Sequence, residues 1–366
     1  RAECPLIAET GGINAMIVDS TSLLEQAVQD VVRSAFQSAG QRCSACRIVC
    51  VQSDSADQFI ELLSGAMQTL RIGDPAEIST DIGPIIDAEA YHRIAAYIGA
   101  MRQTHSVIGE APRAKAKDQT LLAPIAFEVA AVSDVKKEVF GPVLHLVRFD
   151  APQLNELLED INQLGFGLTM GLHTRIDARI AQTTARAKVG NLYINRDQIG
   201  AIVGEQPFGG EGLSGTGPKA GGPDYLLRLT ETNSGPRITP TAPLTLPGPT
   251  GETNTLSYVP RGNLLCLGGD DPSDLEGQIA RVKATGNTPV VPGATQIESL
   301  LNDPSLAGVM IEGGRRNEIA KRLAKRPGPI LPLLSVQDED YRFRLERVVS
   351  VDTTAAGGNA ALLATV

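Results

Sequence analysis

Short apolar runs alternate with longer segments of helical spacing over residues 1–225 of the sequence. The runs at 16–18 and 47–51 are rich in Ile and Val, which is typical of buried strands. Between them, residues 23–38 carry apolar side chains three and four positions apart, as in an amphipathic helix. This alternation predicts an α/β fold. Further strands are expected at 143–149 and 191–195, and further helices at 58–70 and 88–101.

Prolines gather within residues 226–258 and interrupt this pattern. Because proline can neither continue a helix nor donate to a sheet ladder, this stretch predicts an extended edge ribbon or a linker. After it, apolar runs flank a helical segment at 273–285, which predicts a smaller α/β domain over 259–340. Residues 341–366 are expected to form a C-terminal tail.

The composition excludes several classes of protein. Apolar residues make up 42% of the 366 and charged residues 20%, which is an ordinary globular balance. With a net charge of −9 and no Lys/Arg-rich run, the segment is not expected to bind nucleic acid. No apolar run reaches the roughly 18 residues of a transmembrane helix. Five cysteines without a signal peptide favour thiols in a reducing compartment, so we expect a cytoplasmic protein.

The segment from Gln41 to Cys46 gives the strongest indication of chemistry. Cys43 follows Arg42 and the turn residue Gly40, and a nearby cation lowers a thiol pKa and favours the reactive thiolate. Glu9 lies on a glycine turn 34 positions earlier and offers a general base. The two residues predict covalent catalysis in which Cys43 is the nucleophile.

Other motifs suggest other chemistry. Cys43 and Cys46 form a C-x-x-C pair, so a thiol–disulfide redox module is an alternative function. A metal site is not expected, because a second cysteine pair is missing and the four histidines are scattered. Residues 210–215 match G-x-G-x-x-G, but no strand leads into them and no helix follows. Phosphate binding is therefore not expected there.

Four short motifs, taken in order and spacing, resemble the aldehyde dehydrogenase superfamily. They are Glu9-Thr10-Gly11-Gly12, Gly40-Gln41-Arg42-Cys43, Glu138-Val139-Phe140-Gly141-Pro142 and Pro207-Phe208-Gly209-Gly210. Residues 71–75, 81–84 and 195–204 are similar to the L-glutamate γ-semialdehyde dehydrogenase branch. The ending at 352–360 is similar to the tail of the proline utilization A family, in which a flavin-dependent proline dehydrogenase precedes this module.

This resemblance implies a fold and a role for each matching residue. Residues 1–225 would be the catalytic domain, with the last strand of the NAD-binding domain at 1–9, followed by an oligomerisation ribbon and a smaller Rossmann-like domain. Cys43 would be the nucleophile and Glu9 the base that activates the deacylating water. Glu138 and Phe140 would hold the nicotinamide end of NAD. The substrate would be bound by Ser44, by the backbone N–H groups of Gly200 and Ala201, and by Phe208.

The implied reaction is NAD-dependent oxidation of L-glutamate γ-semialdehyde to L-glutamate in proline catabolism. The resemblance also implies a homodimer or a higher homo-oligomer, with FAD bound only in the part that precedes this module. In the family most of the NAD-binding domain lies upstream of the glutamate motif. We therefore expect the sequence to begin inside a larger protein and do not expect its 366 residues to be active alone. A non-catalytic assembly domain, using the ribbon and tail, is a second alternative.

Overall fold

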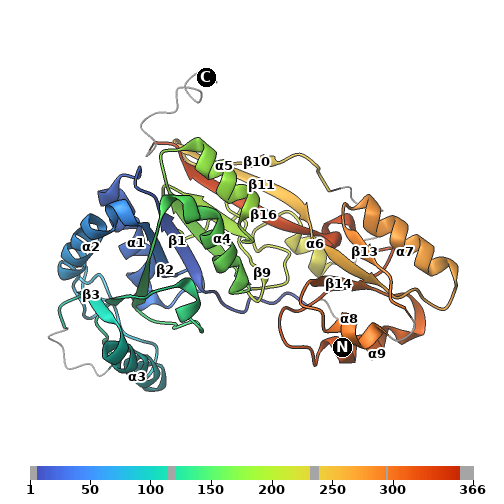
Figure 1. Ribbon diagram of the computed structural model, residues 1–366, viewed down its shortest axis with the longest axis horizontal. Helices are drawn as coiled ribbons and strands as arrows, with labels where there is room; N and C mark the ends of the chain where they lie inside the picture. The colour runs from blue at the N-terminus through green and yellow to red at the C-terminus, as the bar shows by residue number, and fades with distance from the viewer. Residues whose placement is uncertain (1–5, 114–119, 231–238, 294–295, 355–366) are drawn as a thin grey trace. The chain divides into compact units, whose positions relative to one another are not determined.

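The chain folds into two compact units of α/β structure. The computed structural model describes residues 6–113, 120–230, 239–293 and 296–354 (Figure 1). The larger unit comprises 11–201, 248–253 and the residues from 349 on, and the smaller unit comprises the residues up to 10, 202–247 and 254–348. Among the described residues, no helix combines the length and apolarity needed to cross a membrane. The α/β class predicted from the alternating pattern is confirmed.

The larger unit is built on a mostly parallel sheet in the order β8-β7-β1-β2-β5-β4-β3. Each described neighbouring pair is parallel except β3 with β4. Strands β1 and β2 are buried along their whole length, which explains why both read as continuous apolar runs. The strands are β1 (Asn14–Val18), β2 (Cys46–Gln52), β3 (Ser106–Glu110), β4 (Ile125–Glu128), β5 (Val143–Phe149), β6 (Phe166–Gly167), β7 (Thr169–His173) and β8 (Asn191–Ile194).

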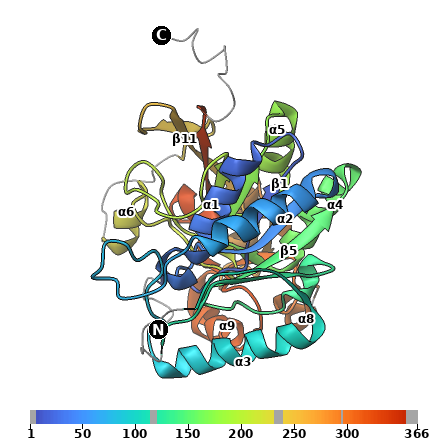
Figure 2. The same cartoon turned by 90° about the vertical axis from the view of Figure 1, so that its left-hand side faces the viewer.

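Helices cover both faces of this sheet (Figure 2). On one face pack α1 (Leu24–Phe36), α2 (Ser53–Gln68) and α3 (Ala88–Thr104), and on the other pack α4 (Leu154–Gln163) and α5 (Asp177–Arg186). Helix α1 buries Val28 and Val31, which lie three positions apart and therefore share one side of the helix. The strand side chains divide between the two cores, since Met16 faces one and Ile17 the other.

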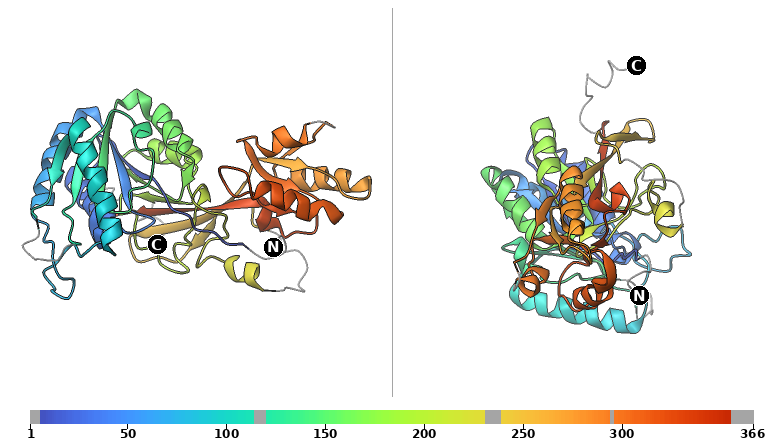
Figure 3. Two further views of the ribbon diagram at one scale, coloured as in Figure 1. Left: turned by 90° about the horizontal axis from the view of Figure 1, so that it is seen from below. Right: turned by 90° about the vertical axis from the view of Figure 1, so that its right-hand side faces the viewer.

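The smaller unit contains a second, four-stranded parallel sheet in the order β13-β12-β14-β15 (Figure 3). Leu264 and Leu265 of β12 point to opposite faces, so each face has its own apolar cluster. The elements are β9 (Glu211–Gly212), α6 (Tyr225–Leu229), β12 (Asn263–Cys266), α7 (Ser273–Ala284), β13 (Thr288–Val290), α8 (Ile297–Leu301), β14 (Leu306–Met310), α9 (Arg316–Leu323) and β15 (Leu333–Leu334).

The proline-rich stretch leads into an antiparallel ribbon of β10 (Leu244–Leu246) and β11 (Glu252–Pro260). Strand β11 adjoins β16 (Arg344–Asp352), and Leu256, Tyr258 and Val348 form a small core there. Residues 344–352, predicted as part of the tail, are therefore a strand. The remainder of the predicted tail, 355–366, lies outside the described residues, and so does Cys4. The predicted domain boundaries stay predictions.

Candidate active site

Cys43 lies in the loop between α1 and β2, at a sharp change of chain direction. The short 3-10 segment Gln37–Gly40 precedes it, with Ser38 and Ala39 in the left-handed region at φ 57° and 54°. Gly40 follows at φ 65°, and a Cβ on it would lie 2.2 Å from the carbonyl oxygen of Gly141. Only glycine fits this position. Cys43 itself is half-buried and its sulfur is a thiol.

Side chains from neighbouring strands hold the backbone carbonyls of the Cys43 loop. Asn14 Nδ2 donates to the carbonyl oxygens of Cys43 at 2.7 Å and Ala45 at 3.0 Å. Gln198 Nε2 and Thr169 Oγ1 both donate to the carbonyl oxygen of Ser44, each at 3.3 Å. With these carbonyls fixed, the orientation of the peptide units around the thiol is fixed as well.

Arg47 connects this loop to the residues predicted to hold the cofactor. Its side chain is 1% exposed, and its Nη1 donates to the carbonyl oxygens of Gly40 at 2.7 Å and Gly141 at 3.1 Å. Its Nη2 donates to the carbonyl oxygen of Arg42 at 3.1 Å and pairs with Glu138 Oε1 at 3.4 Å. The guanidinium carbon lies 5.4 Å from the centre of the Phe140 ring. Glu138 and Phe140 therefore both contact the side chain of Arg47.

The electrostatics of this cluster are set by burial and by the Arg47–Glu138 pair. Burial lowers the pKa of Arg47, whereas the charge of Glu138 raises it, with smaller contributions from Cys46 and Cys43. Burial likewise raises the pKa of Glu138, and Arg47 and the backbone N–H of Gly12 oppose that shift. Arg42, the cation predicted to lie beside the thiol, instead donates to Ser38 Oγ at 3.1 Å. The buried cation of the loop is Arg47.

Two of the predicted substrate ligands flank the loop within the larger unit. Ser44 is 6% exposed and follows the nucleophile directly. Gly200 is exposed at φ 76°, and a Cβ built on it would meet nothing within 4 Å. The segment that carries Gly200 and Ala201 is tied to the core through Gln198, whose backbone N–H donates to Ser34 Oγ at 3.1 Å.

Glu9 and Phe208 belong to the smaller unit, so their predicted roles toward Cys43 stay predictions. Glu9 is exposed and forms an isolated antiparallel bridge with Gly215. Thr10 N–H donates to the carbonyl oxygen of Ser214 at 3.1 Å, which holds the glutamate turn against the 210–215 loop. Phe208 is half-buried and pairs with Ala220. No helix begins after this glycine-rich loop in the described structure, as the phosphate-binding motif would need.

The second cysteine of the C-x-x-C pair has a different environment from the first. Cys46 is fully buried in the core, and its Sγ donates to the carbonyl oxygen of Ile48 at 3.2 Å. Burial raises the pKa of Cys46 to about 12, and it raises the pKa of Cys50 further. A thiolate is needed for disulfide exchange, so this burial disfavours the redox alternative. Within the described ranges, no group of three or more His, Cys, Asp or Glu is arranged to hold a metal ion.

Sequence reasoning missed the four polar residues that hold the loop, Asn14, Arg47, Thr169 and Gln198. For two of these residues, Arg47 and Asn14, the sequence contained an indication. Arg47 opens the apolar run Arg47-Ile48-Val49-Cys50-Val51, and Asn14 begins another. A polar side chain on a strand that is buried on both faces needs partners inside the protein. The partners themselves cannot be read from the sequence. Arg47 finds them on Gly141 and Glu138, and Asn14 finds them on Cys43 and Ala45.

Comparisons with known proteins agree with this geometry. The sequence profile of the aldehyde dehydrogenase family matches residues 2–234. The bifunctional protein PutA of Salmonella typhimurium is 41% identical over 440 aligned residues, which cover 98% of this chain and 33% of that protein. The 1-pyrroline-5-carboxylate dehydrogenase of Geobacillus kaustophilus is 39% identical over 61% of this chain and 43% of its own length. The chain thus spans about a third of the PutA proteins it matches.

A comparison with solved structures finds relatives of the same two kinds. The structure of proline utilization A from Corynebacterium freiburgense superposes with a TM-score of 0.79 at 25% identity, and the match covers 98% of this chain and 40% of that one. A 1-pyrroline-5-carboxylate dehydrogenase structure superposes with a TM-score of 0.57 at 35% identity over 61% of this chain and 43% of its own.

Proposed function

Because this chain belongs to the aldehyde dehydrogenase family, we propose that it oxidises L-glutamate γ-semialdehyde to L-glutamate, with Cys43 as nucleophile and NAD as hydride acceptor. The observation that carries the proposal is the Cys43 loop, whose carbonyls are fixed and which Arg47 ties to Glu138. The names of the relatives support the substrate, since L-glutamate γ-semialdehyde is the open-chain form of 1-pyrroline-5-carboxylate. This reaction belongs to proline catabolism.

The proposed reaction uses residues of this chain for each step. The thiolate of Cys43 adds to the aldehyde carbon, and the carbonyl π electrons move to oxygen to give a thiohemiacetal. Glu138 and Phe140 would hold NAD, which would supply a hydride acceptor. The C–H bond of the thiohemiacetal then breaks with loss of hydride, and the electrons on its oxygen re-form a carbonyl, which gives a thioester on Cys43. Glu9 then takes a proton from a water molecule that attacks the thioester, and L-glutamate leaves as the thiolate re-forms.

The residues present suit the nicotinamide end of the cofactor. Glu138 keeps 20% of its side chain exposed, so its carboxylate can accept hydrogen bonds from ribose hydroxyls. The Phe140 ring is 41% exposed and can cover one face of a flat ring. The guanidinium group of Arg47 contacts both side chains. We propose NAD rather than NADP, on the resemblance to the γ-semialdehyde branch.

The proposed specificity depends on recognition of the carboxylate of the substrate. Ser44 and the backbone N–H groups of Gly200 and Ala201 would bind that carboxylate, and Phe208 would pack on the aliphatic chain. An aldehyde without the carboxylate would leave these polar groups unpaired, so we expect its kcat/KM to be lower by about a hundredfold or more. Butanal is the comparison aldehyde, because it keeps the aldehyde and the aliphatic chain but lacks both the carboxylate and the α-ammonium group.

Production of NADH by a longer protein that contains these residues together with the expected upstream part of the NAD-binding domain tests the proposal, since the 366 residues are not expected to be active alone. In that protein we expect NADH to form with L-glutamate γ-semialdehyde and NAD, and to form far more slowly with butanal. A cofactor-independent assay, acylation by p-nitrophenyl acetate, separates loss of the thiol from loss of the cofactor site. Equal kcat/KM values for the two aldehydes would show that the carboxylate ligands are wrongly assigned.

We also propose that the chain forms a homodimer or a higher homo-oligomer in the cytoplasm. The support is β10, which ends the strand order and so leaves the hydrogen-bonding groups of one edge unpaired by the sheet. Such edges pair readily with another copy. Light scattering after Thr245→Pro tests this proposal, because proline removes a backbone donor from β10. An unchanged mass would exclude β10 as the contact.

A further inference from the structure

The smaller unit encloses a cavity of about 690 Å³ that has no part in the proposed chemistry. Every residue that lines it belongs to this unit. Its walls are formed chiefly by the loop 209–219, by residues 328–333 leading into β15, and by residues 341–346 at the start of β16. Pockets for small organic ligands have volumes of roughly 300–1,000 Å³, so the cavity has the size of a ligand site.

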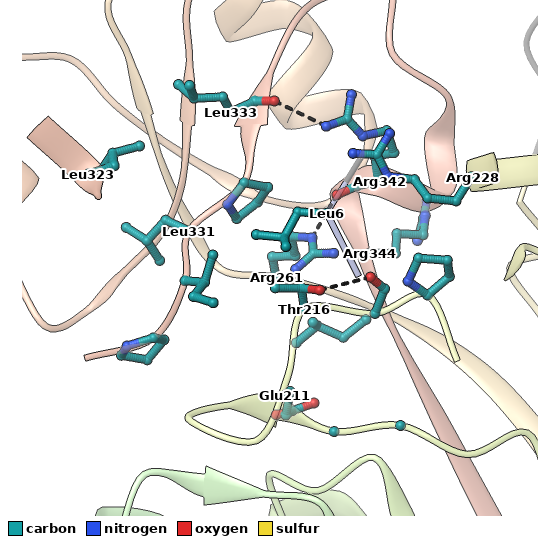
Figure 4. A pocket seen from close by; sticks show the side chains of 18 of the residues that line it. Leu6, Glu211, Thr216, Arg228, Arg261, Leu323, Leu331, Leu333, Arg342 and Arg344 are labelled. Atoms are coloured by element: carbon teal, nitrogen blue, oxygen red, sulfur yellow. Dashed lines mark hydrogen bonds between the residues drawn. The ribbon is translucent and has the colours of Figure 1, made fainter. Parts of the chain in front are cut away.

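Four arginines line one side of this cavity: Arg228, Arg261, Arg342 and Arg344 (Figure 4). Arg342 has its own partners, since it pairs with Asp338 and donates to the carbonyl oxygen of Leu333 at 3.1 Å. For the other three, no carboxylate of the described residues lies within ion-pair distance. The Nε of Arg344 is buried and has no hydrogen-bond acceptor among the described residues.

Without a bound anion, burial of these positive charges disfavours the charged form of the arginines. Burial lowers the pKa of Arg261 to about 10, and the charge of Arg342 lowers it further. Burial and the charge of Arg342 also lower the pKa of Arg228. Buried cations are ordinarily paired or hydrogen-bonded. Arg261 Nε donates to the carbonyl oxygen of Arg342 at 2.6 Å. None of the three guanidinium groups has a carboxylate partner among the described residues, which is unusual for a wall that serves packing alone.

The carboxylates of the same cavity do not pair with these three arginines, and Oε1 of Glu346 is buried without a hydrogen-bond partner among the described residues. Glu211 binds Arg347 through both of its oxygens, at 2.7 and 3.1 Å. Glu346 accepts from the backbone N–H of Lys219 at 2.7 Å, and its buried position raises its pKa to about 7. Both carboxylates favour the charged form of Arg261 from a distance. Neither neutralises it by direct contact.

Another part of the wall carries apolar side chains, among them Leu323, Leu331 and Ile330. Figure 4 shows Leu323 and Leu331 on the side away from Arg228 and Arg342, with Leu6 between the two groups. Arg316, Lys321 and Arg326 also line the cavity, and both arginines donate to backbone carbonyls. The cavity therefore offers arginines without a carboxylate partner together with an apolar stretch of wall.

We propose that this cavity binds a small organic oxyanion, whose phosphate or carboxylate head pairs with Arg228, Arg261 and Arg344 and whose apolar body lies on the apolar stretch of wall. Guanidinium groups present paired N–H donors that match both head groups. The site is distinct from the Cys43 loop and does not depend on the reaction proposed for it.

Calorimetric titration of the purified protein with octyl phosphate, octanoate and octanol tests the proposal, because the three probes share a chain and differ in the head. We expect octyl phosphate or octanoate to bind at least about tenfold more tightly than octanol. Raising the salt concentration should weaken the anion and leave octanol unchanged. Whichever anion binds more tightly identifies the preferred head group.

Arg344→Gln should weaken the bound anion about tenfold without changing the affinity for octanol. Arg93→Gln is the matched control, since Arg93 is an exposed arginine of α3 in the larger unit. An anion that binds no more tightly than octanol, or that Arg93→Gln weakens as much, would overturn the proposal. If Arg344→Gln fails to fold, the comparison of probes and the salt dependence of the native protein still decide it.

Discussion

Arg47 in the larger unit is buried and Arg344 in the smaller unit is half-buried with a buried Nε, and their partners differ. Arg47 is paired with Glu138, and it also donates to three backbone carbonyls around the Cys43 loop. Arg344 has no carboxylate partner among the described residues, and its buried Nε has no acceptor there. The first arginine completes a structure within the chain. The second leaves a charge that a molecule from outside can pair with.

The largest expected effect concerns the thiols of the Arg47 region. Cys43→Ser should lower the rate of acylation by p-nitrophenyl acetate by about 10⁴-fold, because the nucleophile is removed. Cys46→Ser should leave that rate within about threefold, because Cys46 lies in the core and its burial disfavours the thiolate. Stopped-flow absorbance measures both rates. The opposite ranking would mean that Cys46 is the nucleophile.

The two arginines can be compared directly by replacing each with methionine. Arg47→Met should lower the free energy of unfolding by about 3–5 kcal/mol, because it leaves the Glu138 carboxylate without its partner. Arg344→Met should cost less than about 1 kcal/mol, since no ion pair is lost. Urea unfolding followed by circular dichroism measures both. Similar losses would show that Arg344 has a structural partner equivalent to Glu138.

Two glycines test how rigidly the Cys43 loop is held. Gly40→Ala should destabilise the protein by about 2 kcal/mol or more, because both the left-handed backbone and the contact with the Gly141 carbonyl oppose a Cβ. Gly200→Ala is the matched control, with a left-handed φ of 76° and nothing within 4 Å, and should cost about 1 kcal/mol. Thermal unfolding gives both values. A larger loss for Gly200→Ala would contradict the close contact at Gly40.

A pH-dependent effect concerns a buried acid of the larger unit. Burial, reinforced by Asp197, raises the pKa of Asp30 to about 7 from an ordinary value of 3.8. The folded state therefore holds this proton more tightly than the unfolded state, so the stabilising contribution is complete below pH 3.8 and is lost as the pH rises toward 7. Relative to Asp30→Asn, the native protein should lose at most about 1.4 kcal/mol per pH unit in that window.

Urea unfolding of both proteins across this range measures the difference. His173 acts in the opposite direction, because burial lowers its pKa to about 4 from 6.5 and stability is gained as the pH rises between these values. Because His173 Nε2 lies 3.5 Å from Asp30 Oδ2, both proteins are compared in a His173→Gln background, which removes this effect. A constant difference between the two proteins would mean that the pKa of Asp30 is not raised.

The sequence predicted the fold class well because local pattern determines it. The runs that became β1 and β2 are apolar apart from Asn14, Arg47 and Gln52, as is typical of strands covered on both faces. It also indicated Cys43, Glu138 and Phe140 through short motifs. The sequence could not show that Arg47 connects these residues. One acceptor of Arg47, the carbonyl oxygen of Gly141, lies 94 positions away in the chain. Likewise, nothing local in the sequence brings Arg228 and Arg261 to the same cavity as Arg344.

The burial of Cys46 has a consequence for oxidative damage. A peroxide converts an accessible thiolate to a sulfenic acid, which a second, nearby thiol can capture as a reversible disulfide. Cys43 is half-buried, whereas the other described cysteines, Cys46, Cys50 and Cys266, are buried. No described cysteine is thus available to rescue an oxidised Cys43. We expect reversal to require a small thiol from solution, and prolonged exposure to peroxide to inactivate the protein permanently.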